Sequence, residues 1–576
     1  MIRLSGRLAR GACACVLVCG LTVGLATSSQ ADTHSVNCKT GGDLQARINA
    51  ATSGDTILVK GTCVGNFEVT GKSLTIKGNP PATLDGDDVF TTLTINASGE
   101  SVRLTGLTVT GGAAPFGAGI DKTLGRLVLN RVKVTGNVAA DTAGPTGGGG
   151  ILSGAGPVKL INSKVSANRA LATGTSQSAT GGGLRVHDGN LTVKDSVISR
   201  NRATASPAAG SSSAKGGGLY VDNGGLVLRG SKVSGNRVTA SSTGSTAAHG
   251  AAGFQNSGSK ADISASVVRG NDATANSTSS ASDAGQTLSL AGSPASVRDS
   301  RILSNTATAT TTSSFRADTE AGGVYANELL LVRSTVDGNR LDATSSGAGG
   351  ALSEGGGIMG QTSTRLVAST LSRNHVSAQT SAAMQASAWG GGGYVSSLKA
   401  INSTIALNTV KATATGIGGS AYTDGGGLDA SGCCSIVNST VARNSISTSG
   451  ATSFGENGGG LYTSSGVTLE ATIVANNTAA MGPDCNIDPD SDGHNLIRKP
   501  QGCSFTKKNT DKVGKNPKLG TLRDNGGPTE TMALTPASPA RNAIPKADCA
   551  VAKDQRGVHR PRGSRCDIGA YERKSG

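Results

Sequence analysis

One six-residue pattern of polar and apolar positions recurs along most of the chain. Its copies read SKVSAN, SVISRN, SKVSGN, SRILSN or STVARN, with an aliphatic residue three places before a closing asparagine. Eleven asparagines close these copies: Asn137, Asn168, Asn201, Asn236, Asn271, Asn305, Asn339, Asn374, Asn408, Asn444 and Asn476. Neighbouring copies lie 31 to 36 residues apart, so the pattern indicates eleven copies of one structural unit.

The aliphatic position is filled in every copy. It holds Val134, Val165, Ile198, Val233, Val268, Ile302, Val336, Leu371, Ile405, Val441 and Ile473. Short segments with alternating apolar residues, bounded by Gly, Asn and Ser, are typical of β-strands. Strands of one unit must pair with the same strands of the next, in parallel coils about 4.8 Å apart. We therefore predict an all-β fold, a right-handed parallel β-helix, with this column of residues facing the core.

Two landmarks mark the bends of each coil. The recurring Asn suits a left-handed backbone bend, and stacked Asn side chains can hydrogen-bond from coil to coil. Glycine runs such as GGGLRV and GGGLYV open most coils, where glycine permits a sharp corner. Loops rich in Ala, Ser and Thr, such as RATASPAAGSSSAKGGG, lie between each Asn and the next glycine run. We expect a flexible fringe along one edge; glycosylated or ligand-contacting loops are the alternative.

The ends of the chain differ from the repeats. Residues 1–31 combine three arginines with an apolar run and with small residues at Ser29 and Ala31, which indicates a signal peptide cleaved after Ala31. No later segment approaches the roughly 20 apolar residues of a membrane span. We therefore expect an exported protein without a transmembrane segment. Its N-terminal cap and first coils would occupy residues 32–125, its repeats 126–480, and a loop-rich, disulfide-containing region 481–576.

Composition and charge narrow the function. The chain has 85 glycines and only 2% aromatic residues, which leave little bulk for one compact core. The net charge of +15 falls to +12 without Arg3, Arg7 and Arg10 of the signal peptide. The sequence has no dense basic cluster with interleaved aromatic residues of the kind that nucleic-acid binders use. We expect a solvated basic surface and no nucleic-acid partner.

Eight cysteines follow the signal peptide, and an even number in an exported chain suggests disulfides. Proximity in the sequence favours three pairs: Cys38 with Cys63, Cys485 with Cys503, and Cys549 with Cys566. The adjacent Cys433 and Cys434 stay unassigned. Zinc is the competing interpretation, but no paired CxxC or His/Cys cluster is present.

The start of the mature chain, GGDLQARINAATSGDTILVKGTC, predicts a short amphipathic helix from about Leu44 to Ala51 before a first strand from Thr56 to Val59. With the repeats, it resembles the pectin lyase-like family of right-handed parallel β-helix proteins, over roughly residues 41–480. In that family the helix caps the open core, which would otherwise expose apolar side chains and strand edges.

Two segments near the C-terminus, NPKLGTLRDNGGPTETMALTPASPARNAI and DQRGVHRPRGSRCDIGAYE, resemble the C-terminal region of bacterial secreted β-helix proteins of the choice-of-anchor type. In those proteins the region precedes diverse surface anchors. No sorting motif or apolar tail follows Tyr571, so the resemblance implies a protein that is released or held noncovalently.

Polysaccharide lyases and hydrolases share this fold, so carboxylate pairs are the relevant catalytic candidates. Galacturonan hydrolases of the family combine Asn-Thr-Asp with a paired Asp, Gly-His-Gly and Arg-x-Lys, whereas this chain has only residues 509–511 as NTD, beyond the repeats. Asp424 with Asp429, and Asp188 with Asp222, are the best available pairs for glycoside hydrolysis. Isolated surface acids are the simpler interpretation, and no catalytic residue is assigned.

A calcium loop is the only cofactor site that the sequence suggests. The segment DPDSDGHN places Asp488, Asp490 and Asp492 at alternating positions and a glycine sixth. Lys499 occupies the twelfth position, where a bidentate Glu is expected. A turn stapled by Cys485 and Cys503 is therefore favoured over calcium. His187, beside Arg185 and Asp188, is interpreted as an exposed histidine.

One outward column supplies the candidate binding face. After each glycine run the chain should alternate, with Leu184, Leu219, Val324, Ile358, Leu428 and Leu461 facing the core. Their successors should then face solvent: Arg185, Tyr220, Tyr325, Met359, Asp429 and Tyr462, with Gln255 in the equivalent place of a coil lacking the full glycine run. Three of the six tyrosines of the chain lie in this column.

Exposed tyrosine can stack on a sugar ring and hydrogen-bond through its hydroxyl. The simpler interpretation is that tyrosine is a favourable strand residue. The sequence therefore predicts a noncatalytic extracellular β-helix protein that binds polysaccharide or another cell-surface ligand. A polysaccharide lyase or glycoside hydrolase and a structural surface spacer are the alternatives.

Overall fold

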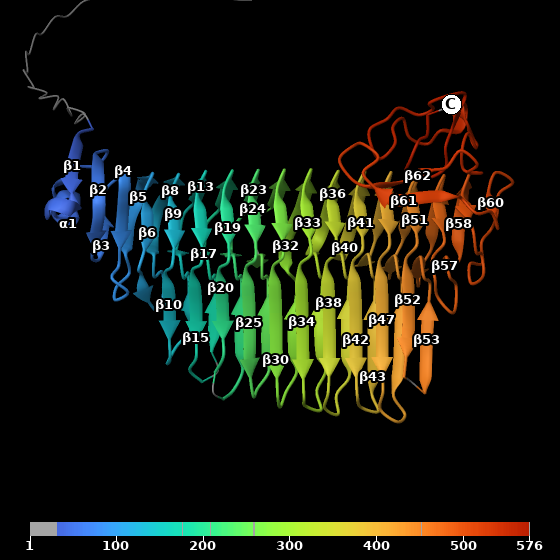
Figure 1. Cartoon of the computed structure of the whole chain (residues 1–576), viewed down its shortest axis with the longest axis horizontal. Helices are drawn as coiled ribbons and strands as arrows, with labels where there is room; N and C mark the ends of the chain where they lie inside the picture. Colours follow the sequence, from blue (N-terminus) through green and yellow to red (C-terminus); the bar gives the residue numbers. More distant parts are fainter. Residues whose placement is uncertain (1–30, 176, 208, 257–259, 451, 575–576) are drawn as a thin grey trace, which may run out of the picture.

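The chain folds as a parallel β-solenoid of about ten turns with only 2% helix, which confirms the predicted fold class (Figure 1). This computed structural model describes residues 31–574 except 176, 208, 257–259 and 451. The predicted signal peptide lies outside the described residues. Each coil pairs in parallel with the next, as β17 (Leu184–His187) does with β22 (Leu219–Asp222).

The body of each coil has three short strands, which we call its first, second and third faces in chain order. The first face comprises β12 (Ile151–Ser153), β17, β22, β27 (Gly253–Asn256), β32 (Leu288–Arg298), β36 (Val324–Val332), β40 (Ile358–Val367), β44 (Gly393–Val395), β49 (Leu428–Ala430) and β54 (Leu461–Thr463). Strands β32, β36 and β40 run on into the second face. That face also holds β13 (Val158–Ile161), β18 (Leu191–Lys194), β23 (Leu226–Arg229), β28 (Ala261–Ser264), β45 (Leu398–Ile401), β50 (Cys434–Val437) and β55 (Val467–Glu470).

The third face contains the repeated six-residue pattern. Its strands are β9 (Lys133–Thr135), β14 (Lys164–Ser166), β19 (Val197–Ser199), β24 (Lys232–Ser234), β29 (Val267–Arg269), β33 (Arg301–Leu303), β37 (Thr335–Asp337), β41 (Thr370–Ser372), β46 (Thr404–Ala406), β51 (Thr440–Ala442) and β56 (Ile473–Ala475). Its middle residues are buried, as predicted for this column.

The last copy of the pattern lies one residue out of the predicted register. Val441 pairs with Val474, which belongs to the solenoid core, whereas Ile473 packs against the C-terminal region. The asparagine of this copy is accordingly Asn477, not Asn476. Two consecutive asparagines follow this strand, so the sequence pattern alone did not separate them.

The recurring asparagines form a buried hydrogen-bonded ladder. Asn339 Nδ2 donates to Asn374 Oδ1 at 2.9 Å, and the same contact recurs between successive coils up to Asn444 and Asn477, at 3.0 Å. The predicted left-handed conformation belongs to the residue before each ladder asparagine, such as Arg373 with φ 52°. The asparagine closes the bend through its side chain rather than through its own backbone.

The segments between the ladder and the glycine runs are strands, so the expectation of a flexible fringe is wrong. They form two parallel sheets that project from the body as a fin, seen below the body in Figure 1. The first fin sheet contains β7 (Ala113–Ala114), β10 (Val138–Asp141), β15 (Arg169–Ala172), β20 (Arg202–Ala205), β25 (Arg237–Ser242), β30 (Asp272–Ser277), β34 (Thr306–Thr311), β38 (Arg340–Ser345), β42 (His375–Thr380), β47 (Thr409–Ala414) and β52 (Ser445–Ser449).

The second fin sheet leads back to the body. It contains β11 (Thr146–Gly147), β16 (Ser178–Thr180), β21 (Ser212–Lys215), β26 (Thr246–His249), β31 (Ser282–Gly285), β35 (Ala317–Glu320), β39 (Ala351–Glu354), β43 (Gln385–Trp389), β48 (Ser420–Asp424) and β53 (Ser453–Asn457). Each strand ends at the glycine run that opens the next first-face strand.

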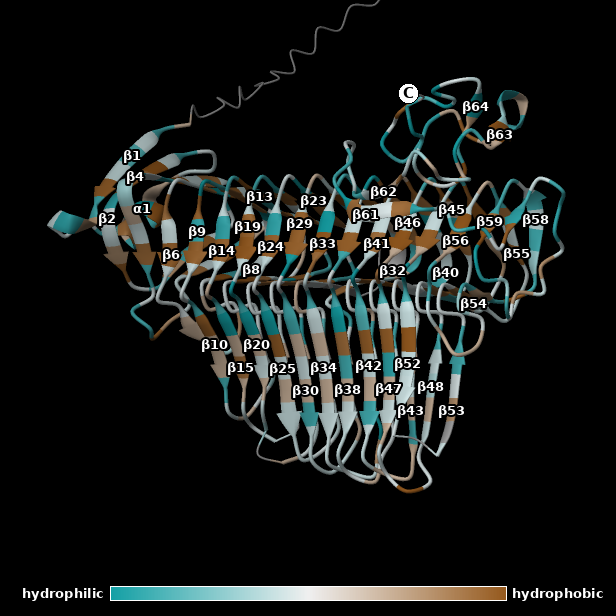
Figure 2. Cartoon of the chain, turned by 45° about the vertical axis from the view of Figure 1, so that its right-hand side comes forward, coloured by the Kyte–Doolittle hydropathy of each residue, from teal (hydrophilic) through white to brown (hydrophobic). Residues whose placement is uncertain are grey.

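The fin has a hydrophobic core of its own, made of small side chains. Of the 27 described residues in this core, 22 are alanine. In Figure 2 the body strands accordingly carry strongly hydrophobic bands, whereas the fin strands are paler. Hydroxyl groups supplement the packing, as where Thr319 and Ser353 hydrogen-bond at 2.7 Å between neighbouring coils.

At the N-terminal end, helix α1 (Leu44–Ala50) ends one residue earlier than predicted and buries Leu44 and Ile48 in the solenoid core. It is followed by β2 (Thr56–Val64), which extends beyond the predicted strand. No helix in the part of the chain that the structure describes is long and apolar enough to cross a membrane.

The C-terminal region folds back over the third face of the last coils (Figure 1). It contains two antiparallel pairs, β61 (Leu519–Arg523) with β62 (Thr531–Leu534) and β63 (Ile544–Pro545) with β64 (Arg565–Cys566). Thr370 Oγ1 donates to the Glu530 carbonyl at 2.7 Å, and Thr404 Oγ1 to Gln555 Oε1 at 2.6 Å. Threonine hydroxyls on β41 and β46 thus anchor this region.

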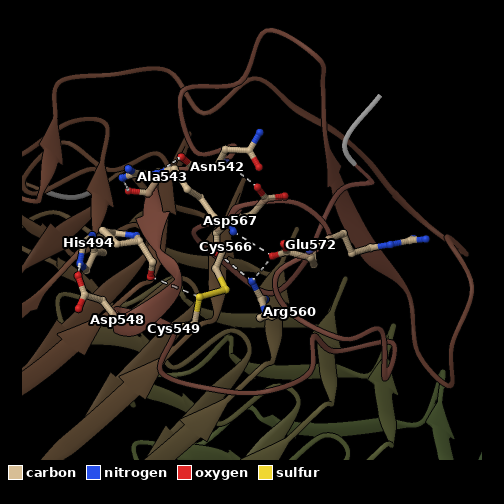
Figure 3. The surroundings of a disulfide bond; sticks show 12 residues. His494, Asn542, Ala543, Asp548, Cys549, Arg560, Cys566, Asp567 and Glu572 are labelled. Atoms are coloured by element: carbon tan, nitrogen blue, oxygen red, sulfur yellow. Dashed lines mark hydrogen bonds and ion pairs between the residues drawn. A yellow bond between two sulfur atoms is a disulfide. The ribbon is translucent and has the colours of Figure 1, made fainter.

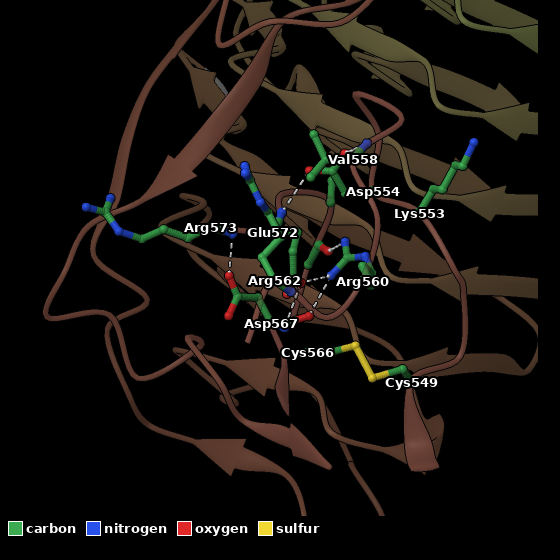
Figure 4. Close-up of polar contacts among 12 residues, drawn as sticks. Cys549, Lys553, Asp554, Val558, Arg560, Arg562, Cys566, Asp567, Glu572 and Arg573 are labelled. Atoms are coloured by element: carbon green, nitrogen blue, oxygen red, sulfur yellow. Dashed lines mark hydrogen bonds and ion pairs between the residues drawn. A yellow bond between two sulfur atoms is a disulfide. The ribbon is translucent and has the colours of Figure 1, made fainter. Parts of the chain in front are cut away.

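The DIGAYE segment joins the C-terminal region to the last coils of the solenoid. Its Gly569 N donates to the Ala471 carbonyl at 2.8 Å, and a Cβ on Gly569 would lie 2.7 Å from Ile473, so only glycine fits. Its Glu572 accepts from the buried Arg560 at 2.9 Å, and its Asp567 accepts from the backbone of Arg573 (Figure 4). These buried, paired charges lock the segment against the body.

Candidate functional site

The first face carries a continuous column of positions that alternate along each strand with the core-facing positions. In register from coil to coil, the column contains Arg185, Tyr220, Phe254, Ser289, Tyr325, Met359, Tyr394, Asp429 and Tyr462. We call it the tyrosine column, because it holds four of the six tyrosines of the chain. Six residues of the predicted face therefore do share one column: Arg185, Tyr220, Tyr325, Met359, Asp429 and Tyr462.

Two members differ from the prediction for one reason. Gln255 pairs with the buried Val221, so its predicted place is wrong, and Phe254 occupies the column position of that coil. Tyr394 belongs to the column but was not predicted. In both coils a glycine takes the inward position: Gly253 lies against Leu219, and Gly393 lies against Ile358. Large neighbours fill the core there, so the rule that a large apolar residue follows each glycine run does not hold in these two coils.

The glycine runs are the corners at which the second fin sheet meets the first face. Gly216 and Gly458, each the first of its run, have φ of 63° and 69°. A Cβ on Gly147, at the end of a fin strand, would lie 3.2 Å from the Arg185 guanidinium. Other fin strand ends lie beside column residues of their own or the next coil. Burial and Glu320 raise the pKa of Tyr325, and burial and Asp424 raise the pKa of Asp429. The Trp389 ring lies beside that of Tyr394, whose pKa burial and Glu354 raise, and Asn457 donates to Asp424 at 2.8 Å.

We call this concave junction the aromatic–acidic corner; it comprises the tyrosine column and the facing strand ends Glu320, Glu354, Trp389, Asp424 and Asn457. The strand ends cover part of the column, so the expectation that all its members face solvent is wrong. Tyr220, Met359 and Asp429 are only 6%, 4% and 5% exposed. Tyr325, Tyr394 and Tyr462 are half-buried, with one side against the fin.

Carboxylates crowd together in the corner. Burial and the neighbouring Glu320 raise the pKa of Glu354 to about 7. Burial, together with Asp424 and Glu354, raises the pKa of Asp429 well above its ordinary value. The pKa of the Tyr394 hydroxyl is also raised, by burial and by Glu354 and Asp429. With a pKa of about 7, the Glu354 carboxyl is partly protonated near neutral pH, and in that form it can donate as well as accept hydrogen bonds.

An apolar hollow of about 530 Å³ adjoins the corner on the outer side of the second fin sheet. Phe315, Leu352, Met384 and Trp389 line it, with Arg316 at its edge. Trp389, the only tryptophan of the chain, lies with its ring centre 6.1 Å from that of Tyr394. Its buried Nε1 has no hydrogen-bond partner among the described residues. The hollow and the corner thus form one surface around a tryptophan with a free donor.

The structure brings together both carboxylate pairs that the sequence suggested. Asp424 and Asp429 lie in the corner: burial and Asp424 raise the pKa of Asp429, and burial and both carboxyls raise the pKa of Tyr462. Asp188 and Asp222 instead flank His187, whose Nε2 and Nδ1 lie 3.2 and 3.1 Å from their carboxylates. His187 is 43% exposed and this cluster lies on the second-face side of β17, away from the corner.

The three predicted disulfides are confirmed: Cys38–Cys63, Cys485–Cys503 and Cys549–Cys566. The last of these joins β64 to the end of the short 3-10 helix Lys546–Asp548, and Asp548 contacts His494 at 3.5 Å (Figure 3). Cys433 is exposed and Cys434 is buried, and both are free thiols.

The suggested calcium segment is a strand rather than a loop. Asp490 and Asp492 lie exposed on β58 (Pro489–Gly493), Asp488 precedes it, and Asp492 contacts Lys508 at 3.6 Å. Within the described residues no group of three His, Cys, Asp or Glu side chains is placed to hold a metal ion. The strand geometry does not support the calcium-loop interpretation, and calcium binding at this segment remains a prediction.

The residues before each glycine run carried the signal that sequence reasoning missed. Segments such as ADTE, ALSE, SAW and YTD alternate small and large or charged residues with a period of two. Because of that alternation, the small residues lie in the alanine core of the fin. The large or charged residues lie on its outer face, and some of them form the corner.

Comparison with known proteins does not assign the chain to a family. No family model matches it, and no curated protein matches it significantly.

Proposed function

We propose that the protein is an exported β-solenoid that binds an extended polysaccharide along the aromatic–acidic corner. The observation that carries this proposal is the in-register tyrosine column facing a row of carboxyl groups and Trp389. Aromatic faces stack on the apolar faces of sugar rings, and carboxyls hydrogen-bond to their hydroxyls. Because the column repeats about every 4.8 Å, an extended chain lying along the solenoid axis would meet several of these groups.

Export is part of the same proposal. Three disulfides fit an oxidising compartment, and the predicted signal peptide over residues 1–31 would take the chain there. Sequencing the N-terminus of the protein recovered from culture medium tests this directly. A mature chain that begins at Asp32 is expected, and retention of the first 31 residues would contradict it.

Binding is tested with the double variant Trp389→Ala/Tyr394→Ala against a panel of neutral polysaccharides, by calorimetry. These side chains lie outside the solenoid core, so the fold should survive while affinity falls at least tenfold. Phe90→Ala is the matched control, because Phe90 is an exposed aromatic residue, 51% accessible, near the N-terminal end of the solenoid. Equal affinity of the double variant and the wild type for a bound glycan would reject the corner as the site.

Glycoside hydrolysis is the second candidate, and one observation favours it. Glu354, with its pKa raised to about 7, can act as a proton donor at neutral pH, and other carboxyl groups of the corner lie near it. Release of reducing ends by the wild type, abolished in Glu354→Gln and Asp429→Asn, would support an enzyme. Tight binding without any release would support the binding protein.

A further inference from the structure

The third face of the early coils carries a basic groove that the proposed function does not use. The groove has a volume of about 890 Å³ and runs over β9, β14, β19, β24, β29 and β33. Its five cations are Lys133, Lys164, Arg200, Lys232 and Arg269. Each comes from a different one of five consecutive coils, which are spaced about 4.8 Å apart along the solenoid axis. Lys133, Lys164 and Lys232 share one register position, Arg269 lies in register with Ser234, and Arg200 lies in the bend after Ser199.

These cations have no counter-charge. No acidic residue lines the groove, and none of the five takes part in an ion pair among the described residues. Some cations elsewhere on the surface are paired, as Arg237 is with Asp272 at 2.6 Å and Arg333 with Asp299 at 2.6 Å. Lys133 and Lys164 even stand directly opposite each other in register, an arrangement that costs stability.

Hydroxyl groups also recur from coil to coil along the groove. Thr135, Ser166, Ser199 and Ser234 occupy successive coils beside the cations and line the groove. Four of the five coils thus present a cation and a hydroxyl donor to the same strip of surface, and in the fifth coil Arg269 takes the place of the hydroxyl residue. Hydrogen bonds from such groups to an ionised oxygen are stronger than those to a neutral one.

The groove ends where acidic residues first appear on the third face. At β37 the corresponding coil carries Asp337, which pairs with Arg373 at 2.8 Å, and Arg373 also contacts Glu530 of the C-terminal region at 2.8 Å. Beyond that point the face is covered by the C-terminal region. The open groove is therefore bounded on one side by the region that docks on the later coils.

We propose that this groove binds an anionic glycan, a linear chain of sugar units that carries one negative group per one or two units. The regular spacing of single charges and hydroxyls fits such a chain. Two observations disfavour nucleic acid. A DNA strand carries a phosphate about every 3.4 Å, closer than the coil spacing, and no aromatic residue lines the groove to stack on bases.

This second site is independent of the aromatic–acidic corner, since it lies on a different face and recognises charge rather than sugar rings. Carboxylate, sulfate and phosphate esters share the required chemistry. Polygalacturonate, heparin and a phosphodiester-linked polysaccharide are the probes that distinguish them, with dextran as the uncharged control and duplex DNA as the competing class.

The test uses the full mature protein and the triple variant Lys133→Ser/Lys164→Ser/Lys232→Ser. The matched control is Lys77→Ser/Lys159→Ser/Lys399→Ser, which removes the same charge from exposed lysines of the second face. Affinity for at least one anionic glycan should fall tenfold or more in the groove variant and less than twofold in the control. Wild-type affinity should also weaken steeply with added salt.

Stability supplies a second measurement. Removal of repelling charges should leave the melting temperature of the groove variant at or above that of the wild type at low salt. The proposal is overturned by equal losses in both triple variants, by tighter binding of duplex DNA than of every glycan, or by no binding of any anionic glycan. Unchanged heparin binding in Trp389→Ala/Tyr394→Ala shows that the two sites are separate, whereas a joint loss contradicts their independence.

Discussion

The solenoid body and the fin are made by the same coils, yet their cores are built from side chains of very different size. The body packs Leu, Ile and Val in one continuous core, whereas the fin packs alanine against alanine. Buried apolar area stabilises by about 25 cal/mol per Å², so each body residue contributes more than each fin residue. The comparison indicates that the body supplies the stability, while the fin positions its strand ends over the tyrosine column.

The largest effect should follow from a charge in the body core. Ile405 is fully buried on β46, so Ile405→Asp should cost several kcal/mol, about 4 or more, because an unpaired carboxylate cannot be solvated there. Thermal and urea unfolding measure this loss. Ile417→Asp is the matched control, since Ile417 is 96% exposed in a fin loop. An unchanged melting temperature for Ile405→Asp would contradict the inward register.

The fold of the body could be predicted from the sequence because each coil repeats the same pattern of residues. The same aliphatic position recurs in every copy, and ten of the eleven copies have the predicted register in the structure. Only the copy with Asn476 and Asn477 was misplaced, because either asparagine satisfied the pattern. The disulfides were predictable because each joins cysteines that are neighbours in the sequence, 17 to 25 residues apart.

Interrupting the asparagine ladder should have the next largest effect. Asn339→Ala would leave the Asn305 backbone N–H and Nδ2 without the acceptor that both now use, each at 3.1 Å or less. Buried unsatisfied groups cost about 1–3 kcal/mol each, so a loss of about 3 kcal/mol is expected.

Asn79→Ala, at an exposed asparagine of β4 (Leu74–Asp85), is the control for the ladder and should change stability by less than about 0.5 kcal/mol. Denaturant titration of both variants measures the difference. Equal stability of the two would show that the ladder contributes nothing beyond its backbone bend.

The stability of the fin should depend on the volume of the side chains in its core. Ala309 faces the alanine core from β34, so Ala309→Leu inserts bulk between the two sheets and should cost about 1–3 kcal/mol. Hydrogen exchange should show lost protection in the fin strands while the body strands remain protected. Thr308→Leu, at the outward neighbouring position, should leave both unchanged. Uniform loss of protection in Ala309→Leu would mean that body and fin unfold as one unit.

The fin could not be predicted from hydrophobic patterning for a physical reason. Residues 306–311 read TATATT, a period of two made from alanine and threonine, and such small side chains look like loop composition. Their burial depends on a partner sheet that the next half-coil supplies, which no local window contains. Only one part of the aromatic–acidic corner could be predicted. The tyrosine column follows from the alternation of residues in the first face, whereas the facing carboxyl groups belong to the fin, which was not predicted.

The smallest effect concerns the carboxyl groups at the junction of body and fin. Burial and the nearby Glu320 raise the pKa of Glu354 to about 7; Asp318 acts in the same direction, while Arg316 opposes it. The folded protein therefore holds a proton that the unfolded chain releases above about pH 4.5. The stabilising contribution of this proton is complete below that pH and is lost as the pH rises towards and through 7. The melting temperature should thus fall slightly between pH 5 and 8, and Glu354→Gln should flatten that dependence. Glu328→Gln, at an exposed position of β36, is the control and should retain the wild-type pH profile.

A glycan bound in the corner would exclude further water and raise the pKa of Glu354 again. Calorimetry near pH 7 in buffers of different ionisation enthalpy should then detect proton uptake on binding by the wild type and less by Glu354→Gln; identical uptake by both would place the ligand elsewhere.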